Sequence, residues 1–140
     1  MKRTHLALLL AGLGLVASGC ASSDSGSDSS EGVGKPEVKV EAAALLKAFE
    51  KNEAAADGKY KGKTLQVSGV VGKVDTEMLD EEKYIVQVGG GKRYEFTTVN
   101  CNGQSAKAVS KIKKGDKITV VGKFDDGGDL GVELKPCQIQ

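Results

Sequence analysis

The sequence predicts an all-β domain with accessory helices, built around a small five-stranded barrel. One observation is the stretch Lys63–Val74, in which Leu65 and Val67 alternate with polar residues. Such alternation is typical of a strand with one buried face. A second observation is that Gly69 and Gly72 lie within this stretch, where a strand of a small barrel must coil or bulge. The third is the order of the elements that follow.

Four more strands and a short helix follow this first strand. They are expected at residues 83–88 (strand), 93–101 (strand), 105–113 (helix), 117–124 (strand) and 131–139 (strand). Gly89–Gly91 and Asp125–Asp129 are expected to be turns, because glycine supplies the positive φ that tight turns require. Pro136 predicts a bulge or an edge position in the last strand. This order is that of the five-stranded Greek-key barrel called the OB-fold. The alternative is another small barrel, or an open sheet with a helix.

A helix is predicted ahead of the barrel, from Val40 to Ala56, with Asp57–Gly58 ending it. Its narrow apolar stripe consists of Ala42, Leu45, Leu46 and Phe49. A stripe of this width favours packing on the outside or one end of the barrel. A membrane-surface role is the alternative, but three glutamates interrupt the basic polar face that it requires. They are Glu41, Glu50 and Glu53.

The first 19 residues have the pattern of a secretory signal peptide. Lys2 and Arg3 give a basic start, the apolar run Leu6–Val16 follows, and small residues precede Cys20. The apolar run has 11 residues. A membrane-spanning helix needs about 20 residues. We therefore expect residues 1–19 to be a signal peptide and not a transmembrane segment.

The segment Ala17–Cys20 (ASGC) resembles the lipobox of bacterial lipoproteins. The resemblance implies that the chain is cut before Cys20, which then carries lipid and anchors the protein to a membrane. The family usually has Leu where this chain has Ala17, and an ordinary signal peptide with a chance cysteine is the alternative. Ala21 follows the cysteine in place of Asp, which implies the outer membrane, periplasmic side, in a Gram-negative host.

Residues 21–34 contain almost only Ser, Asp and Gly, so they cannot bury enough surface to fold. We expect residues 20–36 to be the lipidated cysteine and a flexible tether that spans about 20 Å, and residues 37–140 to be the barrel domain. The chain has 20 basic and 19 acidic side chains, and removing Lys2 and Arg3 leaves 18 against 19, a net charge of −1. A near-neutral protein gives little support to nucleic-acid binding.

Several short segments resemble the tRNA_anti-like family of bacterial OB-fold proteins. They are Asn52–Asp57, Lys59–Lys63, Val67–Val70, Lys114–Gly122 and Gly131–Cys137. The resemblance covers about residues 38–140 and implies the OB-fold. Many members of the family have the layout of small lipoproteins. The family has no catalytic motif to transfer, and the anticodon-binding domain in its name is an analogy of fold.

Cys101 and Cys137 remain as a pair once Cys20 is set aside. An exported domain lies in an oxidising compartment where such pairs can bond. The third and fifth strands of an OB barrel are adjacent and parallel, and both cysteines lie near the ends of these strands. A disulfide is therefore predicted, and two reduced, buried thiols are the alternative.

The sequence offers little catalytic chemistry. His5 is the only histidine and leaves with the signal peptide, so the mature chain has no imidazole for a general base or a zinc site. Asp125–Asp129 lacks the alternating ligands and the distal glutamate of a calcium loop, which favours a solvated turn. We therefore expect no enzyme, no cofactor and no metal.

OB-folds usually bind ligands across their second and third strands, between two flanking loops. Aromatic candidates on these strands are Tyr84, Tyr94 and Phe96, although some of them are expected in the core. Both loops are acidic, with Asp75, Glu77, Asp80, Glu81 and Glu82 in one and Asp125, Asp126 and Asp129 in the other. Such loops repel phosphate backbones. A basic corner is expected to be a solvated turn, and it consists of Lys111, Lys113, Lys114 and Lys117.

The sequence therefore predicts a monomeric, membrane-anchored envelope protein with an OB-fold binding module. Besides the membrane, its partner is an envelope protein, a glycan or a small ligand. A nucleic-acid-binding OB domain is one alternative, which the acidic loops disfavour. A structural spacer with no specific ligand is the other.

Overall fold

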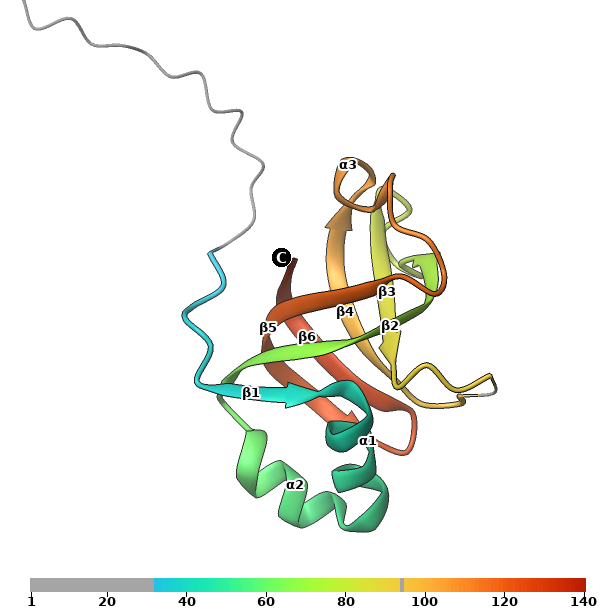
Figure 1. Cartoon of the computed structure of the whole chain (residues 1–140). Coiled ribbons are helices and arrows are strands. Elements are labelled where there is room, and N and C mark those ends of the chain that lie inside the picture. Colours follow the sequence, from blue (N-terminus) through green and yellow to red (C-terminus); the bar gives the residue numbers. More distant parts are fainter. Residues whose placement is uncertain (1–31, 94) are drawn as a thin grey trace, which may run out of the picture.

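The computed structural model in Figure 1 describes residues 32–93 and 95–140. The predicted signal peptide (1–19), Cys20, the tether as far as residue 31, and Tyr94 lie outside the described residues. Within the described part of the chain, no helix is both long and apolar enough to cross a membrane.

The described chain forms a closed five-stranded barrel with one extra strand and three helices. In chain order the elements are β1 (Val38–Glu41), α1 (Ala42–Lys51), α2 (Glu53–Tyr60), β2 (Thr64–Thr76), β3 (Lys83–Gly89), β4 (Thr98–Ser105), α3 (Ala106–Val109), β5 (Lys117–Gly128) and β6 (Gly131–Ile139). The strands are hydrogen-bonded in the order β1-β2-β3-β4-β6-β5, and β2 also pairs with β5 to close the barrel. β4 and β6 are parallel neighbours. This is the predicted OB-fold.

Strand β2 is long and bent, as predicted. Its first half pairs with β5 and its second half with β3. The register with β3 shifts between Val71 and Lys73, so Gly72 marks the expected bulge. Gly69 has a different role, because a Cβ there would lie 2.6 Å from the Gly89 carbonyl oxygen. The chain therefore needs Gly69 where two strands come close together.

Helix α1 covers one end of the barrel, as predicted, and α2 continues beside it (Figure 1). Leu45 is completely buried, and Phe49 is 5% exposed. The Phe49 ring stacks on Phe124 of β5 with 5.7 Å between centroids, and on Tyr60 of α2 with 6.2 Å. These apolar contacts join the helices to the valine-rich interior of the barrel.

The predicted single helix at residues 40–56 was wrong in its bounds. Val38 and Val40 alternate with exposed residues in β1, which pairs in parallel with Leu65–Ser68 of β2. At the start of this pairing, the Glu37 N–H donates to the Thr64 carbonyl at 2.8 Å, and the Glu37 carboxylate accepts from the Thr64 N–H at 2.8 Å. The short alternation of β1 merged with the helical pattern that follows it.

Asn52 divides the predicted helix in two, because its extended backbone ends α1 and its side chain caps α2. The Asn52 Oδ1 accepts a hydrogen bond from the Ala55 N–H at 3.0 Å. The second helix then continues past Asp57–Gly58 to Tyr60. Gly62, with a φ of 75°, follows shortly after the helix end.

The bounds of the later elements differ from the prediction to varying degrees. β6 has the predicted bounds, whereas β4 begins at Thr98 and not at residue 93. α3 is a single turn capped by Ser105, and β5 continues through much of the predicted turn at 125–129. The β5–β6 register shifts between Gly122 and Phe124, opposite Pro136, where a bulge or an edge position was expected.

Candidate ligand-binding site

Of the predicted aromatic residues, the structure describes Tyr84 and Phe96, and it places them at opposite ends of β3. Tyr84 lies near the start of β3, partly buried against the core. Phe96 lies in the β3–β4 loop, at the opposite end of β3, and its side chain is 96% exposed. The expected third-strand position for Phe96 was wrong, because β4 begins only at Thr98.

The outer face of β3 and β4 is polar. Val86 and Val88 point into the barrel, so Gln87 points outward, opposite Asn100 of β4. The amide groups of Asn100 and Asn102 both donate to the carboxylate of Glu133 on the neighbouring strand β6. This face therefore offers hydrogen-bonding groups that already bond to one another.

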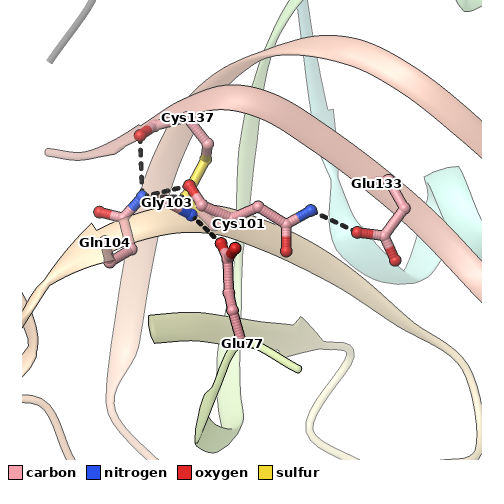
Figure 2. Close-up of a disulfide and its surroundings, with 7 residues drawn as sticks. Glu77, Cys101, Gly103, Gln104, Glu133 and Cys137 are labelled. Carbon is pink, nitrogen blue, oxygen red and sulfur yellow. Dashed lines mark hydrogen bonds between the residues drawn. A yellow bond between two sulfur atoms is a disulfide. The ribbon is translucent and has the colours of Figure 1, made fainter. Parts of the chain in front are cut away.

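One acidic loop joins β2 to β3 and is fastened to β4. The Glu77 carboxylate accepts a hydrogen bond from the Gly103 N–H at 2.6 Å (Figure 2). Met78 and Leu79 at the loop tip are 95% and 100% exposed. Because Lys83 pairs with Ser105, this loop lies at the α3 end of the barrel.

The predicted cysteine pair lies between β4 and β6. The Cys101 and Cys137 sulfurs are bonded at 1.93 Å, with 5.3 Å between Cα atoms. The side chain of Gln104, which is 5% exposed, lies beside the disulfide (Figure 2). Its Nε2 donates to the carbonyl oxygens of Cys137 and Asn102, both at 2.8 Å. The disulfide and the amide thus join the same two strands.

Three hollows surround the β3–β4 loop. The largest, of about 760 Å³, contains Ser68, Thr119 and one opposite charge pair, Glu41 and Lys117. The second, of about 590 Å³, lies among α1, Phe96 and the end of β5. The third has a volume of about 300 Å³ and concentrates positive charge.

We call this third hollow the basic groove and define it by Lys73, Lys92, Arg93 and Lys114. Glu95 is the one acidic residue among the described residues that line it. Glu95 is also engaged elsewhere, because its carboxylate accepts a hydrogen bond from the Gly90 N–H at 2.8 Å. The groove is therefore strongly biased toward anions.

The bulge of β2 brings the segments of the basic groove together. The Gly115 N–H donates to the Val71 carbonyl at 2.8 Å, and the Val71 N–H donates to the Asp116 carbonyl at 2.8 Å. These bonds fix the turn that carries Lys114 against β2. The glycine turn approaches β2 as well. A Cβ added to Gly91 would lie 3.1 Å from the Cγ2 atom of Val70. Lys73 follows the bulge directly.

Lys73 forms an ion pair with Asp75 at the edge of the groove. The hydrogen bond from Lys73, together with one from the Thr76 backbone N–H, holds the pKa of the Asp75 carboxyl below its usual range. Asp75 is therefore ionised at neutral pH and offsets part of the charge of Lys73.

Sequence reasoning missed this groove because it grouped Lys114 with its neighbours in the chain. The structure instead places Lys114 with Lys73 and Lys92, which come from two other segments. Each of these lysines stands next to a glycine, but so do several lysines outside the groove, so this adjacency does not identify it. The pairs in the groove are Gly72–Lys73, Gly91–Lys92 and Lys114–Gly115.

The charged side chains of the basic groove are suited to binding an anion. Among residues 32–93 and 95–140, no group of three His, Cys, Asp or Glu side chains could hold a metal ion. What the site can do chemically is bind an anion through its cations.

One solved structure shares the fold at low sequence identity. A Klebsiella pneumoniae protein, provisionally named a nucleic acid-binding lipoprotein, is 21% identical with a TM-score of 0.58. The match covers 72% of this chain and 90% of that chain. A chain of the S. pombe Stn1–Ten1 complex is 18% identical with a TM-score of 0.37, covering 55% of this chain and 57% of that chain. No curated protein matches the sequence.

The family model named tRNA_anti-like matches residues 1–138. That match spans nearly the whole chain, and it agrees with the OB-fold barrel of the structure. The chain belongs to the tRNA_anti-like family.

Proposed function

We propose that this protein is a bacterial envelope lipoprotein whose OB-fold domain is a non-enzymatic binding module. The observation that carries the anchor is Cys20 itself, which directly follows three small residues and an apolar run. The name of the Klebsiella pneumoniae protein, a lipoprotein of similar fold, supports it. Lipid on Cys20 holds the domain at the outer membrane, on the periplasmic side, in a Gram-negative host.

The binding role is supported by the basic groove and the polar β3–β4 face. Residues 21–37 lie between Cys20 and β1, so lipid on Cys20 would hold the domain near the membrane through a linker. An envelope protein, a glycan or a small ligand is the partner in this proposal. A spacer role without a ligand is the outcome if neither surface binds anything.

Metabolic labelling with radioactive palmitate tests the anchor directly. The wild-type chain is expected to take up label and to sediment with membranes. Cys20→Ala is expected to lose both properties, whereas the control Ser22→Ala is expected to keep them. Unlabelled, soluble wild-type protein would overturn the proposed anchor.

Nucleic-acid binding is a second candidate function, favoured by the exposed ring of Phe96. A single exposed aromatic ring beside cationic residues is a stacking platform of the kind that single-stranded nucleic acids use. The printed name of the Klebsiella pneumoniae protein points the same way.

Titration with fluorescent single-stranded DNA and RNA at two salt concentrations tests this second function. Binding that weakens with salt and with Phe96→Ala supports it, with Leu130→Ala as the control at another exposed apolar position. An absence of binding at low salt excludes it and leaves the envelope partners.

A further inference from the structure

We propose that the basic groove is a phosphate-binding site. It takes the phosphate groups of an anionic ligand between Lys73, Lys92, Arg93 and Lys114. This inference rests on the proposed binding function of the domain and assigns to it a ligand chemistry and a place. The place differs from the centre of the β3–β4 face, where Asn100 and Glu133 already bond to each other.

The groove is assembled from three chain segments that meet on β2. Lys73 follows the bulge, Lys92 and Arg93 follow the glycine turn, and Lys114 lies in the turn after α3. Two backbone hydrogen bonds hold this last turn to Val71. The backbone positions that carry these cations are thus set before a ligand arrives.

Glycines make the floor of the groove open. Gly72, Gly91 and Gly115 all line it, and none carries a side chain that would fill the space between the cations. Gly91 and Gly115 have φ values of 85° and 95°, a conformation that favours glycine. Other residues at these positions would strain the backbone, and at Gly91 a Cβ would press on Val70.

The charge balance of the groove selects an anion with more than one negative charge. Four cationic side chains line it against the single carboxylate of Glu95, which is bonded to Gly90. Lys73 is partly neutralised by Asp75. The positive charge of the three lysines favours a diphosphate, a polyphosphate or successive phosphodiesters over a single carboxylate.

The residue types also indicate phosphate. Arginine offers a planar fork of donors that matches phosphate oxygens, and lysine acts as a mobile point charge. A volume of about 300 Å³ suits a small headgroup or a short stretch of polymer. No aromatic residue is among the described residues that line the groove. The described residues of the groove thus offer positive charge for phosphate oxygens.

Residues 32–140 are suitable for the test because they hold the complete core. The buried apolar residues lie between Ala42 and Cys137, and the barrel closes on itself within this range. The probe is inorganic tripolyphosphate, titrated by calorimetry at about 20 mM salt, where surface charges are weakly screened. Wild-type protein is expected to bind, with an affinity that falls as salt rises.

The variant is the double change Lys92→Gln and Lys114→Gln. Its matched control is Lys39→Gln with Lys123→Gln, which removes the same charge from exposed positions outside the groove. We expect about tenfold weaker binding in the groove variant and less than about twofold in the control. Equal losses in both variants, or no binding by the wild type, would overturn the proposal.

Two further probes identify the source of the phosphate. Single-stranded oligonucleotides present phosphodiesters of nucleic acid, and phosphatidylglycerol vesicles present lipid headgroups. Binding of either that the groove variant loses and the control keeps supports the site and names its ligand. The membrane anchor is tested separately, by labelling Cys20 variants in cells. A groove that binds no phosphate would therefore leave the anchor result unchanged, and an unlabelled Cys20 would leave the titration result unchanged.

Discussion

The Glu95 carboxylate folds back onto its own loop and accepts a hydrogen bond from the Gly90 N–H at 2.8 Å. It also covers Gly89, where a Cβ would lie 2.0 Å from Oε2. Gly89 and Gly90 therefore do more than reverse the chain, because the Glu95 carboxylate packs against both. Lys92 and Arg93 lie on the loop that Glu95 closes.

Gly89→Ala is expected to displace Glu95 while leaving the barrel intact. The new methyl group would meet the far end of a flexible side chain, which can move at little cost in stability. We expect faster exchange of the Gly90 amide hydrogen and a change of less than about 1 kcal/mol in the free energy of unfolding. Amide exchange followed by NMR measures the first effect, and an unchanged Gly90 rate would contradict this role of Glu95.

Gly69 and Gly72 of β2 are expected to differ sharply in how well they tolerate substitution by alanine. A Cβ at Gly69 would lie 2.6 Å from the Gly89 carbonyl oxygen and 2.9 Å from the Ala42 Cβ, whereas one at Gly72 would meet the Gln87 carbonyl at 3.7 Å. Gly69→Ala should therefore cost about 3 kcal/mol, because backbone atoms must shift. Gly72→Ala should cost less than about 1 kcal/mol. Urea unfolding compares them, and equal losses would be inconsistent with this packing.

Removal of the disulfide is expected to destabilise the domain substantially. Cys101 and Cys137 are separated by 36 residues in the chain. Closing a loop of that length contributes about 4 kcal/mol in the chain-entropy description. The double variant Cys101→Ala with Cys137→Ala should show this loss in urea, and reductant should bring the wild type close to it. A loss below about 1 kcal/mol would mean that the disulfide restricts the unfolded chain much less than this description predicts.

Gln104 is expected to stabilise the contact between β4 and β6 through its two hydrogen bonds. Gln104→Met keeps the length of the side chain but leaves the Asn102 and Cys137 carbonyls without this donor. We expect a loss of about 2 kcal/mol in the free energy of unfolding. Gln66→Met, at a half-exposed position on β2, is the control and should change it little. Similar losses in both would assign the effect to the methionine and not to the hydrogen bonds.

The ion pair between Lys73 and Asp75 predicts a measurable pH effect. Lys73 lowers the pKa of Asp75 by hydrogen bonding, so the pair stabilises the fold above the ordinary aspartate pKa. That contribution is lost as the pH falls through the lowered pKa. Lys73→Gln should raise the pKa of Asp75 toward its ordinary value, although the Thr76 N–H still bonds to it. Carbon-detected NMR titration measures the shift, and an unmoved pKa would exclude Lys73 as its main cause.

The sequence predicted an element correctly where a local pattern of residues also determines the structure. The alternation in β2 and the bulge at Gly72 follow from a period of two and from a missing side chain, so both were visible in the residues. β6 also has the predicted bounds. The four residues of β1 were too few for such a pattern to be distinguished from the helix that follows.

The basic groove could not be predicted because no local pattern encodes it. Lys73, Lys92 and Lys114 are separated by about twenty residues each, and only the packing of two turns on β2 unites them. In the same way, the alternation that placed Phe96 on a strand is overridden by a loop that Glu95 fastens to Gly90. Tertiary contacts, and not propensity, determine both places.

The paired hydrogen bonds between Glu37 and Thr64 have a mechanical consequence. Any pull on the chain ahead of the domain reaches the barrel at Glu37, at the start of β1. Two bonds to Thr64 must break there before the load passes on to the parallel pairing of β1 with β2. Through that pairing the load reaches β2, and through the chain it reaches the buried start of α1. The bonds of Glu37 to Thr64 are therefore the first contacts with the barrel that such a pull loads.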